Sequence, residues 1–500
     1  MMPFVYNFPF FSIFLAMLSG ILTPFLKNGK MAQKVNFIMI SAVGVMSVVL
    51  LFALMQDGGA TYTYMMGHFP APWGNELRAG PLEALMALAF SVVMLLCICG
   101  GFRDVFEDIL PEKQKFYFIM LNLLFSSLLA LVYTNDIFTG YVFIEINTIS
   151  ACAIVMAKDS GETIVATLRY LIMSLLGSGL FLIGITLLYG ITGHLLMSDV
   201  QNQVVQLVAT GRYQVPLTVV VGLITLGLSI KSALFPFHSW LPGAHGSATT
   251  ASSSILSGLV LKGYIILLIK MFYRVFTIDV IRSLRINDIL FFFGLAGMVF
   301  GSLRAIRETH IKRMVAYSSV AQIGYIYMGI AMGTGVGMVA ACFHILAHAF
   351  NKPMLFAAAG ALSATRGHKR EFHDLKGSAY DNKLAGVAFT VGALSMIGIP
   401  LLAGFVSKLY FALGSMDDPG RMWWTLLVLA ASSVLNALYY IPAVIRIWTP
   451  SGEKTAVKAD REKPGAAFVF SMAVFLFANV ALGIGYAPVL RIIETGLSLL

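Results

Sequence analysis

Charged side chains are scarce in this sequence. Only 12% of its 500 residues are Asp, Glu, Lys or Arg, whereas 58% are hydrophobic, and the mean hydropathy is +0.83. Soluble domains carry about 25% charged residues, because their surfaces must be hydrated. The shortage of charge therefore excludes a soluble protein and predicts an integral membrane protein.

Cysteine is also rare, and its four copies are Cys97, Cys99, Cys152 and Cys342. All four lie inside apolar runs, and no His or carboxylate completes a metal-binding set around Cys97 and Cys99. The sequence also lacks a glycine-rich nucleotide-binding motif after a strand and a convincing pair of haem ligands. We therefore expect no metal and no cofactor. Any redox chemistry must come from partners, which leaves open whether the chain serves an enzyme.

Basic residues outnumber acidic ones, 34 to 24, and the net charge is +10. They are spread over many short segments between apolar runs and form no single basic face. The charge therefore gives no reason to expect a nucleic-acid partner.

Long hydrophobic runs, by contrast, recur along the whole chain. A bilayer core about 30 Å thick needs about 20 apolar residues in a helix. The predicted spans are 8–26, 36–55, 82–100, 116–133, 136–157, 168–190, 214–235, 253–273, 288–305, 315–333, 337–362, 385–412, 424–445 and 466–489. These runs are apolar on all sides, whereas the strands of a membrane barrel alternate apolar and polar residues. The predicted fold is all-α, with about 14 transmembrane helices and no separate soluble domain.

The distribution of Lys and Arg predicts the orientation in the membrane. When the loops are assigned alternately to two sides, 22 basic residues fall on one side and 8 on the other. Cytoplasmic loops collect Lys and Arg, so the first side is inside and both termini are outside. The first run has no basic residue before it and no small-residue cleavage site after it, which favours a first span over a signal peptide. We expect a multi-pass protein of the cell's inner (cytoplasmic) membrane.

Several ionisable residues fall within the apolar runs. They are Glu145, Lys231, Lys262, His344, His348, Lys352 and Lys408. A charge at membrane depth costs about 2.5 kcal/mol or more, so a set of this size is not accidental. These residue types can gain and lose protons, and together they predict an ion path through the membrane.

Structural roles remain open for some of these residues. Glu145 and Lys231 could each be one half of an ion pair that joins two helices. Lys352 and Lys408 could extend their ammonium groups to lipid headgroups, whereas Lys262 lies near the middle of its span, where that explanation is poor. If Glu145 and Lys231 are close, the carboxylate would hold the lysine charged, and moving the carboxylate away would release the proton.

One span carries a stripe of titratable groups. His344, His348 and Lys352 follow one another at intervals of four residues, which places them on one face of a helix. This spacing favours a proton relay. Zinc binding by the two histidines is poorly supported, because no third ligand lies nearby.

Two spans contain interruptions near a lysine. Pro236 follows Lys231 by five residues, and Gly398 and Pro400 precede Lys408. Proline removes a backbone donor, which is tolerated at membrane depth only where protein or water satisfies the freed carbonyl. Interrupted helices at corresponding places in two halves are typical of inverted repeats around a transport site. The predicted division is 1–115 (helices 1–3), 116–273 (first five-helix repeat), 288–445 (second five-helix repeat) and 446–500 (C-terminal loop and helix 14).

Four motifs carry a resemblance to a known family. "IKSALFPFHSWLPGAHGSATTASSSILSGLVLKGY" resembles the signature of the antiporter-like membrane subunits of respiratory complex I, membrane-bound hydrogenases and Mrp cation/proton antiporters. "HIKRMVAYSSVAQIGYIYMGIA", "HILAHAFNKPMLFAAAG" and "GIPLLAGFVSKLYF" are similar to further segments of that family in the same order. Upstream, "FPAPWGNELRAGPLEALMAL" and "TNDIFTGYVFIEI" resemble the Mrp D-like branch most. The similarity covers about residues 60 to 415.

The resemblance implies a fold of fourteen helices with two inverted five-helix repeats, in which helices 7 and 12 are broken. It implies proton-transfer roles for Glu145 in helix 5, Lys231 in helix 7, Lys262 in helix 8, His344 and His348 in helix 11, and Lys408 in helix 12. His238 and His245 match histidines of the loop after helix 7. The implied partners are neighbouring membrane subunits, H⁺ and, in some family members, Na⁺.

The sequence departs from the family pattern at several positions. Gly243 stands where the family usually has Asp. Gly80 likewise stands where the Mrp-like pattern usually has Asp. Gln322 replaces a common histidine, and Asn351 and Pro353 flank Lys352 where an aromatic residue and alanine are usual. These differences indicate a side branch of the family rather than a standard complex I subunit.

Three functions are compatible with the sequence. The first is a proton-translocating subunit of a multisubunit respiratory or Mrp-type complex, with exchange of protons for Na⁺ left open. The second is a stand-alone secondary transporter of an organic solute, although a solute site should have a polar cluster around the helix breaks. The third is a structural membrane subunit whose ionisable groups only hold helices together.

Overall fold

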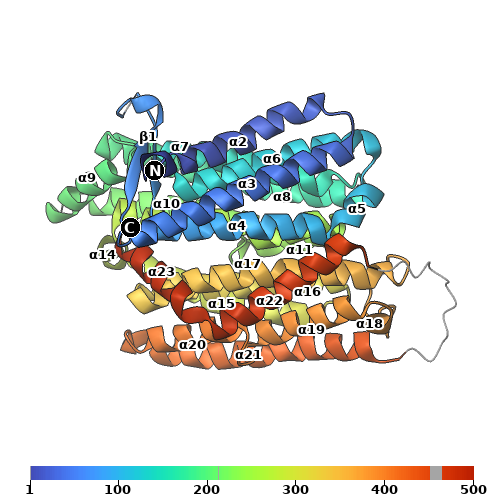
Figure 1. The fold of residues 1–500 in the computed structure, drawn as a ribbon. Helices are drawn as coiled ribbons and strands as arrows, with labels where there is room; N and C mark the ends of the chain where they lie inside the picture. The colour runs from blue at the N-terminus through green and yellow to red at the C-terminus, as the bar shows by residue number, and fades with distance from the viewer. Residues whose placement is uncertain (1, 72, 212, 451–463) are drawn as a thin grey trace.

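The computed structural model describes residues 2–71, 73–211, 213–450 and 464–500. In these residues the chain is almost entirely helical, and the long helices run side by side as one bundle (Figure 1). One short antiparallel sheet is present, with β1 (Tyr62–Met65) paired to β2 (Glu76–Ala79). The all-α prediction is therefore confirmed.

Twelve helices in the described residues are long and apolar enough to cross a membrane. They are α2 with its 3-10 extension (Phe8–Phe25), α3 (Gly29–Gln56), α4 (Pro81–Gly100), α6 (Pro111–Tyr133), α7 (Ile137–Met156), α8 (Gly161–Thr192), α10 (Gln214–Lys231), the segment Thr250–Phe276, α15 (Ile286–Arg307), α17 (Gly335–Ala364), α21 (Pro419–Trp448) and α22 (Ala466–Ile484). The other two predicted spans coincide with α16 (Ile311–Met332) and with α19 (Lys383–Ile397) followed by α20 (Ala403–Ser415). The count of fourteen, the inverted repeats and the four-part division stay predictions.

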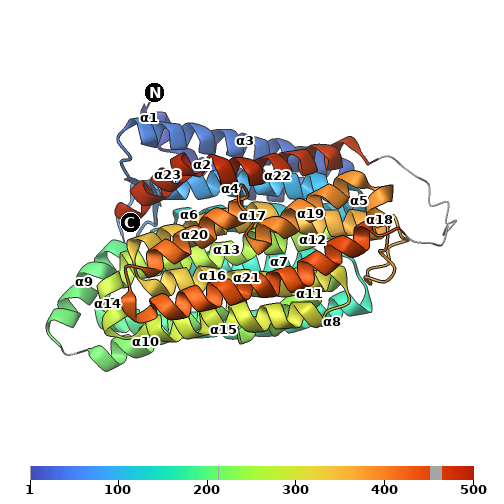
Figure 2. The same ribbon diagram turned by 90° about the horizontal axis from the view of Figure 1, so that it is seen from below.

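Short helices lie at the two ends of the bundle. They are α1 (Met2–Val5), α5 (Phe102–Asp108), α9 (Met197–Ala209), α11 (Leu241–Ser247), α14 (Ile278–Ser283), α18 (Ser378–Asp381) and α23 (Tyr486–Ser498). Both chain termini, the sheet, α9 and α14 lie at one end, here called the terminus end (Figures 1 and 2). The opposite end, with α5 and α18, is here called the far end. The shared position of the termini agrees with the predicted topology, but which side of the membrane each end faces stays a prediction.

Some basic residues used for that orientation lie outside the described residues. They are Arg212, Lys454, Lys458, Arg461 and Lys463.

Both predicted interruptions are present. The first interrupted helix, α10, ends at Lys231, and the chain continues through a short 3-10 turn (Phe237–Trp240) and α11, which packs against α8 and α16. The second break separates α19 from α20 at residues 398–402, where Gly398 has a φ of 98°. A left-handed φ of this kind is open to glycine without a steric penalty, which explains how the helix ends there.

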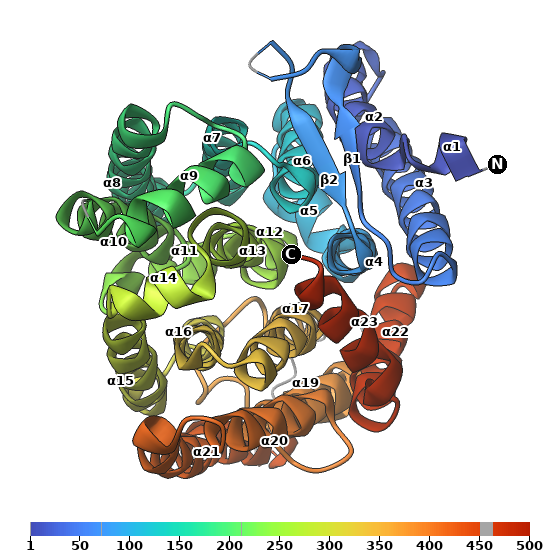
Figure 3. The ribbon, with the colours of Figure 1, turned by 90° about the vertical axis from the view of Figure 1, so that its left-hand side faces the viewer.

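The central helices are buried by the others. Viewed along the helices, α13, α16 and α17 lie inside a ring of outer helices (Figure 3). The segment Thr250–Phe276 is made of α12 (Thr250–Ile255), a π-helical turn (Leu256–Val260), α13 (Leu261–Met271) and a second π-helical turn (Phe272–Phe276), and it is buried at every position except Tyr273. Large apolar side chains are exposed on the outer helices, as expected where helices face lipid. The fold therefore places its central helices away from both lipid and water.

Helices α8 and α10 approach each other closely through two glycines. A methyl group added at Gly177 would lie 2.8 Å from the Gly227 carbonyl oxygen and 3.1 Å from Cγ of Lys231. This contact therefore fixes the position of the end of α10, where Lys231 lies.

We predict that Gly177→Ala lowers the thermal unfolding midpoint of the protein in detergent micelles. Forcing the two helices apart costs about 1–3 kcal/mol. Gly179→Ala is the matched control, because a methyl group two residues further along the same helix meets nothing within 4 Å. The control should leave the midpoint unchanged or raise it. Equal midpoints for the two variants would contradict the packing described here.

Candidate functional site

The predicted acid and base pair is brought together. Lys231 is the last residue of α10, and its Nζ lies 3.6 Å from Oε1 of Glu145 on α7. The start of α7 is fixed by Asp136, whose side chain accepts a 2.6 Å hydrogen bond from the Thr139 amide. The Lys231 side chain is fully buried, whereas that of Glu145 is 23% exposed. The pair therefore joins the protein interior to the surface of the isolated chain.

Hydroxyl and amide groups extend this pair into the bundle. The Lys231 ammonium donates a 2.7 Å hydrogen bond to Oγ1 of Thr148, one turn after Glu145 on α7. The Tyr264 hydroxyl lies 3.3 Å from Oγ1 of Thr148 and donates to Oδ1 of Asn147 at 2.9 Å. Hydroxyl groups can both donate and accept, so this chain can carry a proton between the lysine and α13.

Lys262 lies at the start of α13, within the buried segment. Its ammonium is fully buried and donates to the Ser257 carbonyl oxygen in the preceding π-helical turn. The i to i+5 pattern of such a turn alters the usual carbonyl pairing and is frequent at functional sites. Within the described residues Lys262 has no carboxylate at ion-pair distance. A neutral backbone group therefore holds this ammonium, and the idea that it reaches a lipid headgroup is wrong.

The histidine stripe lies on α17. His344 and His348 share one face of this helix, as their spacing predicts, and both are fully buried. Nδ1 of His344 lies 2.8 Å from Oγ of Ser407 on α20, and the rings of His344 and His348 are 6.2 Å apart. Both ring nitrogens of His348 are buried without a protein partner in the described chain. Buried polar groups of this kind are normally satisfied by ordered water, which would complete a relay.

Lys352, the third member of the stripe, points into the protein. Its ammonium donates to the Val315 carbonyl oxygen at 3.0 Å, to the Ser318 hydroxyl, and to the Tyr440 hydroxyl at 3.4 Å. The side chain is fully buried. The alternative in which Lys352 reaches a lipid headgroup is therefore wrong.

Lys408 lies beside the second helix break. Its ammonium donates to the carbonyl oxygens of Met396 at 3.2 Å and Ile397 at 2.6 Å, which are the last residues of α19, and to Oγ of Ser433 at 3.0 Å. Carbonyl groups at a helix C-terminus have no intrahelical partner and carry partial negative charge. The break thus supplies the groups that stabilise Lys408 inside the bundle.

Lys262 connects the two halves of this site. It lies two residues from Tyr264, which belongs to the Lys231 network. The π-helical turn that holds its ammonium packs against α17, which carries His344, His348 and Lys352. The seven residues selected from the sequence therefore form one set that runs from Glu145 through α13 to α17 and α20.

The supporting residues differ in their positions. His245 is fully buried on α11, its ring stacks on Phe356 at 4.7 Å, and neither ring nitrogen has a protein partner in the described chain. His238 is partly buried and stacks on Phe235 at 5.4 Å. Pro236 and Pro400 are less buried than His245, in keeping with a role in breaking helices rather than in proton transfer. His245 is therefore the better placed of the two loop histidines.

Two buried lysines were missed because they were assigned to loops. Lys270 is 2% exposed within α13, and Lys312 is 4% exposed in the first turn of α16. Each stands within a turn or two of other basic residues at the edge of an apolar run, which in a sequence looks like the start of a loop. The assignment of these two residues to loops is wrong, because Lys270 lies inside the predicted span 253–273 and α16 begins at Ile311, before the predicted start at residue 315.

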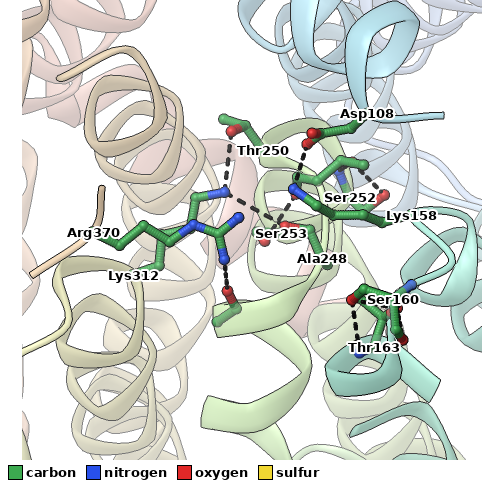
Figure 4. A network of polar contacts seen from close by, with 12 residues as sticks. Asp108, Lys158, Ser160, Thr163, Ala248, Thr250, Ser252, Ser253, Lys312 and Arg370 are labelled. Carbon is green, nitrogen blue, oxygen red and sulfur yellow. Dashed lines mark hydrogen bonds and ion pairs between the residues drawn. The ribbon is translucent and has the colours of Figure 1, made fainter. Parts of the chain in front are cut away.

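Lys312 belongs to a polar network at the far end of the bundle (Figure 4). Its ammonium donates to Oγ1 of Thr250 at 3.1 Å and to the Ala248 carbonyl oxygen at 3.5 Å. Arg370 donates to the Gly246 carbonyl oxygen at 2.9 Å, and Lys158 pairs with Asp108 at 2.9 Å. Lys312 and Arg370 hold carbonyl groups at the end of α11, which fixes the segment that carries His245.

His310 caps the helix that carries Lys312. Its Nδ1 accepts a 3.3 Å hydrogen bond from the Arg313 amide at the start of α16. Burial, together with the positive charges of Arg370, Lys312 and Arg313, lowers the pKa of His310 to about 3. The imidazole is therefore neutral at physiological pH and remains able to accept this bond.

No group of three or more His, Cys, Asp or Glu side chains in the described part of the chain could hold a metal ion. Within these residues the pair formed by His344 and His348 therefore has no third metal ligand.

Comparison with known sequences places this architecture among membrane subunits. A family model described as "NADH:quinone oxidoreductase/Mrp antiporter, TM" matches residues 134–436. NADH-quinone oxidoreductase subunit N of Desulforudis audaxviator (strain MP104C) is 32% identical over 458 residues, covering 90% of this chain and 89% of that protein. The D-type subunit of the Na(+)/H(+) antiporter of Bacillus subtilis (strain 168) is 26% identical over 482 residues, covering 96% and 94%.

Solved structures share the fold. A chain of the membrane-bound sulfane sulfur reductase, an archaeal respiratory membrane complex, matches with a TM-score of 0.87 at 25% identity, covering 99% of this chain and 97% of that chain. A chain of the Mrp complex from Dietzia sp. DQ12-45-1b also gives a TM-score of 0.87, at 22% identity and with the same coverage.

We predict that Glu145→Gln lowers the thermal unfolding midpoint, because Lys231 then stays buried and charged without a carboxylate. The expected loss is about 1–3 kcal/mol, less than for a fully buried pair since Glu145 is partly exposed. Asp159→Asn, which removes the exposed partner of Lys113, is the control and should cost less than about 1 kcal/mol.

The double variant Glu145→Gln/Lys231→Met should recover much of the loss, since no unpaired charge remains. A double variant no more stable than Glu145→Gln would show that the two side chains are not energetically coupled.

Proposed function

Because this chain belongs to the NADH:quinone oxidoreductase/Mrp antiporter transmembrane family, we propose that it moves protons across a membrane as one subunit of a multisubunit complex. The observation that carries the proposal is the set of titratable groups from Glu145 to Lys408, whose members between these two ends are fully buried. A purely structural role for the chain would not explain why so many lysines lie at membrane depth.

In the first half of the path, Glu145 and Lys231 act as a switch. While the carboxylate is 3.6 Å away, it stabilises the charged lysine. When the carboxylate moves or gains a proton, the ammonium can give its proton to the Thr148 hydroxyl while Thr148 and Tyr264 each pass on their own hydroxyl proton, which a neutral Lys262 amine takes up. Lys231 is then neutral and ready to be reloaded.

In the second half, the proton passes from Lys262 to the histidine stripe. His344 and His348 can accept and donate through opposite ring nitrogens, and His344 is linked through Ser407 to the helix that carries Lys408. Lys408 is held by carbonyl groups, so it can lose its proton without leaving an unpaired carboxylate behind. The result is a route across the width of the bundle.

The exposed fraction of Glu145 supports a neighbouring membrane subunit as partner. On the same helix, Phe138, Val142 and Ile149 are exposed, so this face of α7 would otherwise put a carboxylate against lipid. A carboxylate facing hydrocarbon is costly, and a second protein surface would remove that cost. The relatives named above are themselves described as subunits, and both structural matches are chains of complexes.

The finer parts of the proposal concern the ions and the location. We place the complex in the inner (cytoplasmic) membrane with both termini outside, on the distribution of Lys and Arg. Exchange of protons for Na⁺ is supported by the name of the Bacillus subtilis relative, which is part of a Na(+)/H(+) antiporter. Energy for transport comes from the partner subunits or from an ion gradient.

We predict that Lys231→Ala leaves the complex assembled but slows proton transport at least about tenfold, because a proton-transfer group is lost. The complex is purified through a tag on this chain and reconstituted in liposomes that contain a pH-sensitive dye, and a Na⁺ gradient or the partner's substrate drives transport. Lys113→Ala, which removes an exposed lysine, is the control and should transport normally.

Other outcomes identify the other functions. Loss of assembly by Lys231→Ala would support a structural subunit, and normal transport by the assembled variant would refute a proton path through Lys231. Uptake of an organic solute by the purified chain alone would support a secondary transporter. A proton flux that does not respond to the Na⁺ gradient would remove Na⁺ exchange from the proposal.

A further inference from the structure

A second group of buried charges lies at the terminus end, apart from the path described above. It consists of Glu76, Arg78, Glu83, Lys270 and Arg274, whose exposed fractions are 9%, 9%, 3%, 2% and 7%. They come from β2, from the first turn of α4 and from the end of the Thr250–Phe276 segment. Buried charges are costly, so five of them in one place call for a physical explanation.

Lys270 is held without a carboxylate in contact. Its ammonium donates to the carbonyl oxygens of Val132 at 2.7 Å and Thr134 at 2.5 Å, at the C-terminus of α6. The negative end of a helix stabilises a cation through neutral groups. Lys270 can therefore lose a proton without leaving a bare negative charge beside it.

Glu83 and Lys270 border the same small space through the apolar parts of their side chains. Both line one small pocket, together with the apolar side chains of Met86, Ile266 and Leu500. Oε1 of Glu83 is buried and accepts no hydrogen bond from the described residues. Its nearest described cation is Arg78, with Nη1 at 3.9 Å, beyond hydrogen-bond distance. Glu83 is therefore a buried carboxylate whose described charged partner lies beyond hydrogen-bond distance.

The pocket lies between the proton path and the terminus end. Lys270 follows Lys262 by eight residues on the same buried helix, which places them about 12 Å apart along the axis. Cys342, which also lines the pocket, stands two residues before His344 on α17. The pocket is therefore adjacent to both helices that carry the central residues of the path.

The last residues of the chain cover the pocket from the terminus end. Leu500 lines the pocket, and Arg78 donates hydrogen bonds to the Leu499 carbonyl oxygen and to Oγ1 of Thr61 at 3.3 Å. In the view onto this end, the C-terminus lies near the middle of the bundle, beside α4 and α17 (Figure 3). The pocket is thus close to the aqueous side but shielded from it.

We propose that Glu83 and Lys270 form a proton-exchange station, through which protons pass between the membrane path and the aqueous phase at the terminus end. In the release direction, the Lys270 ammonium gives up one N–H proton through an intervening water to the Glu83 carboxylate, which lies beyond ion-pair distance, so that an amine and a carboxylic acid result. The acid then gives the proton to water, and the amine is reloaded from the path. No electrons are transferred, and the reverse sequence takes up protons.

Three further charged side chains lie near Glu83 and Lys270. Arg78 and Arg274 are positive and Glu76 is negative, and all are held nearby by β2 and the end of the buried segment. Asn135 donates a 3.0 Å hydrogen bond to Oε2 of Glu76, so Glu76 is already occupied. Two positive charges and one further negative charge therefore lie around the pair.

This inference rests on the proposed function, and its test uses the same reconstituted complex. We expect Glu83→Gln and Lys270→Arg to assemble normally and to slow proton transport at least about tenfold. Gln has nearly the shape of Glu but cannot carry the proton, and Arg keeps the charge and the donors but does not release its proton. Glu83→Asp should restore part of the rate. Glu162→Gln and Lys113→Arg, changes of the same type at other positions, should transport normally.

The outcomes separate this station from the proposed function. If Lys231→Ala slows transport but Glu83→Gln and Lys270→Arg transport at the normal rate, the station is refuted and the proposed function stands. If Lys270→Arg transports normally while Lys270→Met loses assembly, Lys270 only caps α6, and the inference is overturned. Loss of assembly in Glu83→Gln as well would likewise show a structural role.

Discussion

The structure depends on how an ammonium group is stabilised away from water. Most of the buried lysines are held by backbone carbonyl oxygens. Lys408 binds the end of α19, Lys270 the end of α6, and Lys262 a π-helical turn. Carbonyl groups become available where a helix ends or changes its pattern, so each irregularity in the bundle provides a place for a cation. A neutral partner also tolerates loss of the proton, because no unpaired negative charge then remains.

Lys231 differs from these lysines, since it lies within ion-pair distance of Glu145 as well as of a hydroxyl group. A pair of opposite charges holds its proton more firmly than a carbonyl does, and it responds to movement of either partner. The Glu145 side chain is also the partly exposed member of the pair. Glu145 is therefore the point at which a neighbouring subunit can act on the path, and the lysines beyond it only need to pass the proton on.

Much of the site could be predicted from the sequence. Lysine, glutamate and histidine inside apolar runs are unusual enough to be found by inspection, and the four-residue spacing of His344, His348 and Lys352 gives their common face. Lys270, Lys312 and Glu83 were not found, because each lies near the end of an apolar run. In a sequence, that position cannot be distinguished from a loop until the ends of the helices are known.

The sequence by itself determined the membrane environment, the helical class, the two helix breaks and the identity of most of the titratable groups, because hydropathy, proline and charge act locally along the chain. Only the tertiary structure decided that Glu145 lies beside Lys231, that Lys352 points inward, and that Glu83 shares a pocket with Lys270. These contacts join helices that are far apart in the sequence, and they depend on which face each helix turns toward its neighbours. The sequence of a helix that is apolar on all sides does not show which face packs against its neighbours. The packing of the whole bundle decides this.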